Sequence, residues 1–284
     1  MQSAVSEKPP WWLWPTILSL DAPAVALLWQ ALLAGAVPAV IGAPERFVLG
    51  CSVWLAYAAD RWIEGWRLAP DRIRTWRHAF HVRWRWEIFI VWAGVLALDV
   101  AVAWRGLTRV EFRNGLLLLL AVAAYLLSHQ LVHRSSRWRA PKEACVAALI
   151  AAGSALFLLG LPGAANLALP LGLFTLLCFA NCVLISVWEF EVDRSHGQTS
   201  LALRFRQATT VSRALLWLIG AGSAALFLAG STGLRPAAAC AGASALLLGL
   251  VDLAERRAGR VLARVLADVA LMTPAVPLLC WRLL

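Results

Sequence analysis

Long apolar stretches, separated by short segments rich in arginine, proline and glycine, run through this chain from end to end. A helix needs about 20 apolar residues to cross the hydrocarbon core of a bilayer. With 61% hydrophobic and only 15% charged residues, the chain has too little polar surface for an ordinary water-soluble globule. We predict an all-α, polytopic membrane helix bundle that forms a single transmembrane domain over residues 1–284. The apolar stretches predict nine spans, at residues 19–42, 46–64, 87–104, 115–133, 144–162, 168–190, 211–231, 236–253 and 261–281.

The net charge of +10 could reflect nucleic-acid binding or membrane topology, and its distribution favours topology. If the N-terminus is cytoplasmic, 20 of the 26 Lys and Arg residues fall in cytoplasmic segments and six outside. This bias follows the positive-inside rule, so no nucleic acid is needed as a partner. An odd number of spans places the C-terminus outside. We expect an integral protein of a bacterial inner membrane, with an interfacial N-terminal segment at 1–18 and cytoplasmic loops at 65–86, 134–143, 191–210 and 254–260.

Two pairs of carboxylates, Asp60 with Glu64 and Glu189 with Asp193, lie at predicted cytoplasmic ends of spans. The members of each pair are four residues apart, so they share one face of a helix. Acidic side chains at a membrane are costly and are kept where they bind something. A purely structural interpretation is also open, because neighbouring arginines could pair with these acids at the helix ends. The matching spacing and sidedness favour one site built from two helices.

The chemistry of such a site follows from its oxygen ligands. Mg²⁺ binds through one or two carboxylates and leaves positions open for phosphate. Two facing carboxylate pairs surrounded by arginines therefore suit a diphosphate bridged by Mg²⁺.

The residues around both pairs resemble motifs of the UbiA superfamily of intramembrane prenyltransferases. The run from Glu189 through Gly197 to Arg204 is similar to its second aspartate-rich motif, in particular that of the branch acting on dihydroxynaphthoate. The run from Tyr57 to Glu64 resembles the first motif. The chain departs from the family pattern at four positions, which indicates a divergent substrate or a weakened catalyst: Ala56 replaces Asn, Glu64 and Glu189 replace Asp, and Gln198 replaces Lys.

This resemblance implies a Mg²⁺-dependent transfer of a prenyl group from a polyprenyl diphosphate to an aromatic or other lipophilic acceptor. The metal ligands would be Asp60, Glu64, Glu189 and Asp193, with Asp60 and Asp193 as the catalytic pair. The diphosphate would be bound by Arg61, Arg67, Arg77, Lys142 and Arg194, although for any single arginine membrane topology is the better explanation. The prenyl chain and its carbocation would be lined by Tyr57, Trp54, Trp62, Trp188 and Asn181.

Other polar residues support weaker interpretations. His78 with His81, and His129 with His133, could bind a metal, although solvated or interfacial histidines are the simpler explanation. Asp99 and Asp268 are acids within predicted spans that could pair with Thr, Tyr or Arg on neighbouring helices or line a polar route. The six cysteines lack the spacing of a zinc or redox site.

Three classes of function are therefore open. The first is a prenyltransferase. The second is a degenerate relative that binds isoprenoid lipid without turnover, which Ala56 and Glu64 would fit. The third is a transporter, which would explain acids within spans, but transporters commonly show duplicated halves, and we find no such duplication in the sequence.

Overall fold

A computed structural model describes residues 8–38, 40–67, 75–130, 141–195 and 200–283 of the chain. This described part contains helices and no strands, which confirms the predicted all-α class. The longer helices are α2 (Asp21–Ala34), α3 (Ala43–Arg67), α5 (Arg85–Gly106), α6 (Arg109–Gln130), α7 (Lys142–Ala155), α8 (Ala168–Trp188), α11 (Ala208–Ala229), α12 (Arg235–Ala258) and α13 (Arg260–Ala270). The shorter ones are η1 (Trp11–Leu13), α1 (Trp14–Ile17), α4 (Trp76–Arg83), η3 (Ala164–Leu167), α9 (Phe190–Ser195), α10 (Leu201–Arg204), η4 (Thr232–Leu234) and α14 (Ala275–Leu283).

Helices cover most of each predicted span, but three spans are shorter or broken. In the first, α2 ends at Ala34, and in the fifth, α7 ends at Ala155. The ninth is divided into α13 and α14 by a turn at 271–274. Pro274 lies in this turn, and a proline cannot donate the backbone hydrogen bond that would continue a helix.

The number of membrane crossings is a separate question from the number of helices. In the described residues, five helical segments are long and apolar enough to cross a membrane: Arg85–Gly106, Arg109–Ser128, Ala164–Trp188, Ala208–Ala229 and Thr232–Ala258. A sixth is possible if Trp11–Ile17 and Asp21–Ala34, which meet at 77°, form one broken span. The predicted count of nine crossings is not confirmed and stays a prediction.

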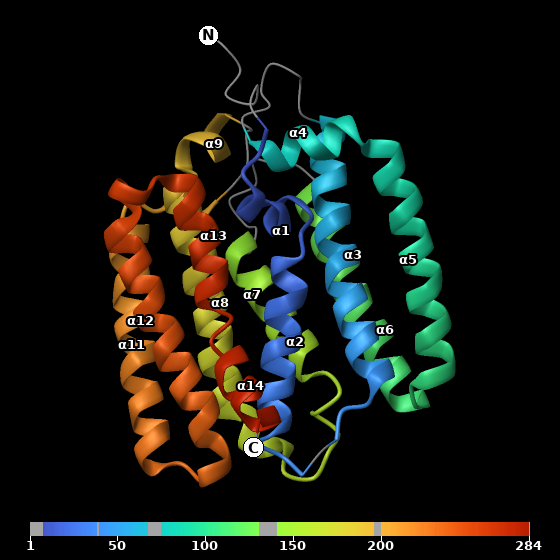
Figure 1. Cartoon of the computed structure of the whole chain (residues 1–284), viewed down its shortest axis with the longest axis vertical. Coiled ribbons are helices and arrows are strands. Elements are labelled where there is room, and N and C mark those ends of the chain that lie inside the picture. The colour runs from blue at the N-terminus through green and yellow to red at the C-terminus, as the bar shows by residue number, and fades with distance from the viewer. Residues whose placement is uncertain (1–7, 39, 68–74, 131–140, 196–199, 284) are drawn as a thin grey trace.

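The long helices stand side by side, and the short helices α4 and α9 lie at one end of the bundle, at the top of Figure 1. Helix α8 packs against α7, α11, α12 and α13, whereas α3 packs against α2, α4, α5 and α6. These two groups are connected through α2 and α7, which contact each other. Helix α2 also contacts α3, and helix α7 also contacts α8. Both helices that carry the predicted acid pairs therefore belong to one bundle.

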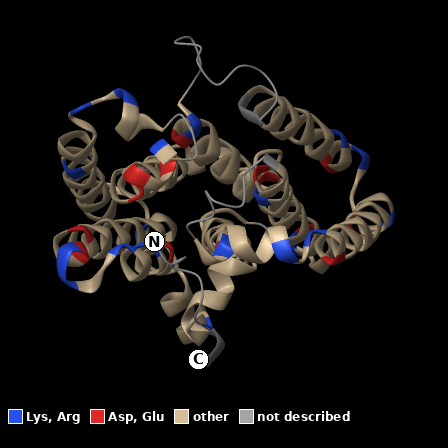
Figure 2. Ribbon diagram, turned by 90° about the horizontal axis from the view of Figure 1, so that it is seen from above, with Lys and Arg blue, Asp and Glu red and all other residues tan. Residues whose placement is uncertain are grey.

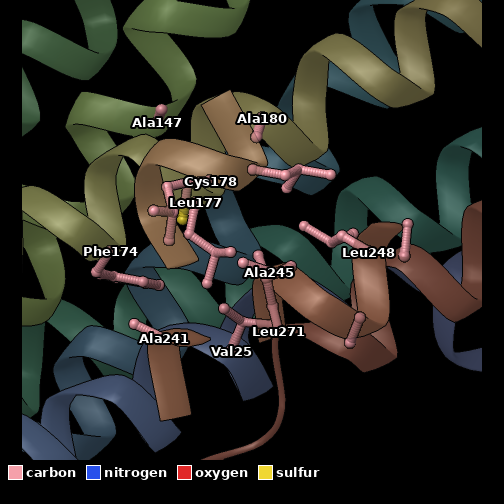
Figure 3. Close-up of a cluster of buried hydrophobic side chains, with 14 of the residues drawn as sticks. Val25, Ala147, Phe174, Leu177, Cys178, Ala180, Ala241, Ala245, Leu248 and Leu271 are labelled. Atoms are coloured by element: carbon pink, nitrogen blue, oxygen red, sulfur yellow. The ribbon is translucent and has the colours of Figure 1, made fainter. Parts of the chain in front are cut away.

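The main hydrophobic core fills the space between α2, α7, α8, α11, α12 and α13 (Figure 3). Trp29 of α2 is fully buried there, stacks on Phe174 with ring centroids 4.3 Å apart, and donates its indole N–H to the carbonyl of Leu271 at 2.9 Å. By contrast, α5 and α6 lie at the edge of the bundle and expose apolar side chains such as Ile90 and Leu117. Such outward apolar faces are expected of helices that contact lipid.

Two of the predicted cytoplasmic loops contain short helices. The segment 65–86 contains α4, and the segment 191–210 contains α10 and most of α9. The segment 134–143 lies mostly outside the described residues. The two short helices α4 and α9 mark the end of the bundle where the acid pairs lie.

Candidate functional site

The first acid pair lies on the last turns of α3, and its second member is held by two donors. Glu64 Oε2 accepts a hydrogen bond from Arg61 Nη1 at 2.8 Å and lies 3.1 Å from His78 Nε2. Arg61 is three residues before Glu64 on the same helix, whereas His78 reaches it from α4. Glu64 therefore joins α3 to α4.

Helix α4 begins at a Thr75 cap, whose hydroxyl oxygen accepts from the backbone N–H of His78 at 3.5 Å. The same hydroxyl lies 2.6 Å from His78 Nδ1. Because a carboxylate only accepts, Nε2 carries the proton that is donated to Glu64, and Nδ1 accepts from Thr75. Burial lowers the pKa of His78 from 6.5 to about 4, the hydrogen bond to Glu64 opposes this shift, and Arg77 and Arg61 reinforce it. The imidazole is consequently neutral at neutral pH.

The second acid pair begins at Glu189, which follows directly after α8. Glu189 Oε2 accepts from Arg77 Nη2 at 3.1 Å and from Arg264 Nη1 at 2.7 Å. Burial raises the pKa of Glu189, but Arg264 and Arg77 outweigh it and hold the pKa far below the usual range. Burial also lowers the pKa of Arg77, to about 10, and the positive charges of Arg264 and Arg61 add to this.

Arg77 and His78 are neighbours in sequence, so α4 links the two acid pairs directly. Arg77 contacts Glu189, and His78 contacts Glu64. The prediction that both windows meet at one end of the bundle is therefore correct for these two glutamates. Figure 2 looks onto this end and shows basic and acidic segments interspersed across the bundle.

The arginine pair on Glu189 is buried and only partly hydrogen bonded. Arg77 is 8% exposed, and the side chain of Arg264 is 15% exposed. Among contacts between described residues, Arg77 Nε, Arg77 Nη1 and Arg264 Nε are buried without a hydrogen-bond partner. An unsatisfied buried donor costs about 1–3 kcal/mol. The pair is therefore short of acceptors in this arrangement.

The other predicted site residues lie at different places around the two glutamates. Asp193 Oδ2 lies 3.8 Å from Lys142 Nζ, beyond hydrogen-bonding distance. Asp60 lies one turn before Glu64 on α3 and is half-buried. Arg194 is exposed on α9, and the side chain of Arg67 lies outside the described residues. The structure thus brings Arg61 and Arg77, of the five predicted basic residues, to the two glutamates.

The aromatic residues predicted to line a prenyl site make contacts that tie helices together. Trp54 and Trp62 donate their indole N–H groups to the carbonyls of Leu18 and Arg85, at 3.0 and 2.9 Å. Trp188 is buried and donates to Asp252 Oδ1 at 3.4 Å. Their role around a prenyl chain stays a prediction, as does that of Tyr57.

Two acids within predicted spans have identified partners. Asp268 Oδ1 accepts from Asn181 Nδ2 at 3.1 Å, which joins α13 to α8. Asp99 Oδ2 accepts from the Ser52 hydroxyl at 2.8 Å, which joins α5 to α3. Both acids therefore have polar partners on neighbouring helices, but these partners are Asn181 and Ser52 and not the Thr, Tyr or Arg that the sequence suggested.

Two of the histidines considered as metal ligands contact protein groups. Besides the contacts of His78, the Nδ1–H of His81 donates to the Arg77 carbonyl at 2.9 Å. The side chains of His129 and His133 lie outside the described residues. Within the described part of the chain, no three His, Cys, Asp or Glu side chains form a group that could hold a metal ion.

Sequence reasoning missed two residues of this region. Arg264 lies at the start of the ninth predicted span, where the sequence indicates only a positive charge that flanks a membrane span. Glu143, which is 2% exposed, accepts from the backbone N–H of Leu201 at 2.7 Å and so holds the end of the second motif against α7. A buried arginine facing an acid on another helix has no signal in local spacing.

Comparison with known proteins supports an assignment of the fold. No family model matches the chain, and no curated protein matches it. Among solved structures, the apo structure of a UbiA homolog from Aeropyrum pernix K1 superposes with a TM-score of 0.65, covering 93% of this chain and 98% of that one.

This chain has the UbiA fold. The sequence identity to that homolog is 17%, so the UbiA fold is shared but the match does not identify substrates. The resemblance that the two acidic windows indicated is thereby confirmed at the level of the fold. The structural match extends over nearly the whole chain.

Proposed function

We propose that this protein is an integral membrane prenyltransferase, which transfers a prenyl group from a polyprenyl diphosphate to an aromatic or other lipophilic acceptor. The observation that carries this proposal is the buried pair Arg77 and Arg264, with unpartnered N–H donors, at the end of a UbiA fold where both acidic windows meet. Guanidinium groups bind phosphate oxygens with strong, charge-assisted hydrogen bonds. A diphosphate headgroup at this end would let its prenyl chain extend into the apolar bundle.

In the proposed reaction the bond between the allylic carbon and the diphosphate oxygen breaks, and the electron pair leaves with the diphosphate. Arg77 and Arg264 would stabilise the negative charge on the departing oxygens. The acceptor carbon then bonds to the allylic carbon, and the proton that the acceptor loses can be taken up by the released diphosphate. The apolar bundle would keep water away from the carbocation.

The Mg²⁺ ion stays part of this proposal. Glu64 and Glu189 already accept from arginines at 2.7–3.1 Å, whereas Asp193 meets Lys142 only at 3.8 Å. Because Mg²⁺ needs one or two carboxylates besides substrate phosphates, Asp193 fits such an ion better than the two glutamates do, and Asp60 is the second ligand that the resemblance to the first motif implies. When bound, Mg²⁺ would supply positive charge to the leaving diphosphate.

The test is release of diphosphate from a series of polyprenyl diphosphates by the purified protein in detergent, with and without Mg²⁺. Asp60→Asn and Asp193→Asn should each lower the rate by about 100-fold or more, the scale for losing a group that stabilises developing charge. Glu191→Gln is the matched control, because Glu191 is exposed on α9 and lies between the predicted ligands Glu189 and Asp193 in the sequence. Equal rates in all three variants would refute the assignment.

The second candidate, an isoprenoid-lipid binder without turnover, is favoured by Ala56, which offers no oxygen where the family motif has Asn. Binding of a polyprenyl diphosphate without any release, at every chain length and Mg²⁺ concentration, would favour this candidate over the enzyme.

A further inference from the structure

We propose that Arg77 and Arg264 bind the diphosphate directly and without a divalent metal ion, and that Glu189 positions these two arginines instead of ligating a metal. The identity of the anion rests on the proposed function. The metal independence rests on contacts of the described residues alone.

Glu189 is shared between two guanidinium groups through a single oxygen. Arg77 Nη2 and Arg264 Nη1 both donate to Oε2, at 3.1 and 2.7 Å, from helices α4 and α13. Two like charges held this close need a fixed counter-charge between them. Glu189 supplies this counter-charge and thereby fixes where both guanidinium groups lie.

The N–H donors of Arg77 and Arg264 that do not contact Glu189 determine which class of ligand the site can bind. Arg77 Nε and Nη1 and Arg264 Nε are buried and have no partner among the described residues. They belong to two guanidinium groups that share one carboxylate oxygen, and a ligand needs several acceptor oxygens and negative charge to satisfy them. A phosphate or diphosphate meets both needs, whereas a neutral hydroxyl brings one oxygen and no charge.

A metal ion at the same glutamates would meet strong competition. Glu64 Oε2 is likewise shared by two donors, Arg61 and His78, at 2.8 and 3.1 Å. A divalent cation that approached either carboxylate would lie within a few ångströms of buried guanidinium groups and be repelled by them. The two glutamates therefore hold their arginine partners in place. A metal ion contributes to the departure of the diphosphate rather than to its binding.

The alternative is that Glu189, Arg77 and Arg264 form a structural clamp between α8, α4 and α13. Such a clamp explains the ion pairs but leaves the unpartnered donors without a purpose. The two explanations make opposite predictions for anion binding.

The experiment measures binding of inorganic diphosphate and of a non-reactive prenyl thiodiphosphate to the full-length protein in detergent, in excess EDTA and in Mg²⁺. The affinity should agree within about threefold between the two conditions. Arg77→Gln and Arg264→Gln should each weaken binding by about 10- to 100-fold, the scale of a lost charge-assisted hydrogen bond. Arg260→Gln, on the same helix with a side chain 61% exposed, should bind like the unaltered protein.

Two further variants separate positioning from metal ligation and from folding defects. Glu189→Gln keeps an acceptor oxygen but loses the counter-charge that holds the two arginines, so it should weaken diphosphate binding by the same factor in EDTA and in Mg²⁺, whereas a metal-ligand role predicts a loss in Mg²⁺ alone. Arg264→Lys keeps the positive charge but loses the planar fork, so its affinity should fall while its thermal midpoint is retained.

The outcomes distinguish this inference from the proposed function. Binding that requires Mg²⁺ and is lost on Glu189→Gln overturns the inference and leaves the proposed function standing. Unchanged binding in both glutamine variants of the arginines also overturns the inference in favour of the clamp. No binding of either probe by folded protein, with or without Mg²⁺, overturns both.

Discussion

Lowering the pH from about 7 to about 5 should destabilise the folded protein through one buried imidazole, that of His78. The side chain is 1% exposed, and burial lowers its pKa from 6.5 to about 4. The native state therefore binds this proton less readily than the unfolded chain does. Stability is full above the unfolded pKa and is lost as the pH falls from 6.5 toward 4, because the unfolded chain takes up the proton first.

The magnitude follows from the two pKa values. A difference of one pKa unit corresponds to about 1.4 kcal/mol, so linkage predicts a loss of about 2 kcal/mol at pH 5 relative to pH 7, rising to about 3 kcal/mol at still lower pH. In a chain of this size, 1 kcal/mol moves the thermal midpoint by roughly 2–4 °C. His78 alone should therefore lower the midpoint by roughly 4–8 °C over this interval.

The assay compares the unaltered protein with His78→Gln in detergent, at one heating rate, at both pH values. Glutamine can still donate to Glu64, but it does not titrate. Between pH 7 and pH 5 the thermal midpoint of the variant should therefore fall by roughly 4–8 °C less than that of the unaltered protein. His81, whose pKa is also lowered by burial, is present in both proteins and cancels in the comparison. If both proteins lose the same number of degrees, the assignment of a neutral, buried His78 is wrong.

Three further changes test the packing around the site by thermal unfolding in detergent. Trp29→Ala should cost about 3–5 kcal/mol, because the indole is fully buried; the control Trp217→Ala, 81% exposed, should cost about 0.5 kcal/mol or less, and equal losses would contradict the described core. Gly259→Ala should cost about 1–3 kcal/mol, because φ is 84° and ψ is 149° at this residue between α12 and α13; an unchanged midpoint would contradict this backbone. Asp252→Ala should cost about 1–3 kcal/mol by leaving the buried Trp188 N–H without its acceptor; a neutral effect would show that this hydrogen bond contributes nothing.

Much of the fold and one part of the site could be predicted from local patterns. Apolar stretches report helices in a membrane directly, because every such helix satisfies its own backbone hydrogen bonds. The spacing within each acid pair, together with the charge bias along the chain, predicted that Glu64 and Glu189 lie at the same end of the bundle. Arg77 and His78 join them there.

The partners of these acids on other helices could not be predicted, because they depend on packing between distant helices. Arg264 is 75 residues from Glu189 in the sequence. In its local sequence, Arg264 cannot be distinguished from any other arginine that flanks a membrane span. Arg61 was a foreseeable partner of Glu64, because it lies three residues away on the same helix, but the contacts that Arg77, His78 and Arg264 make from other helices were not foreseeable. Pro274 is seen in the sequence, but the break of the helix there could not be predicted from it. Whether a helix continues through a proline depends on which neighbouring groups bond to the carbonyl that the proline leaves free.

The two glutamates that carry arginines are the two positions where this chain has Glu in place of the Asp of the motifs it resembles. Glutamate has one more methylene than aspartate, so its carboxylate extends farther from its own helix toward α4 and α13. Glu64 and Glu189 each bring one oxygen within 3.1 Å of donors that include residues on another helix. An aspartate at either position would draw the carboxylate back and leave Arg77 or His78 without this partner. In the site that we propose, the exchange of Asp for Glu and the buried arginines are thus parts of one change, in which two of the four acids support an anion site instead of ligating a metal ion.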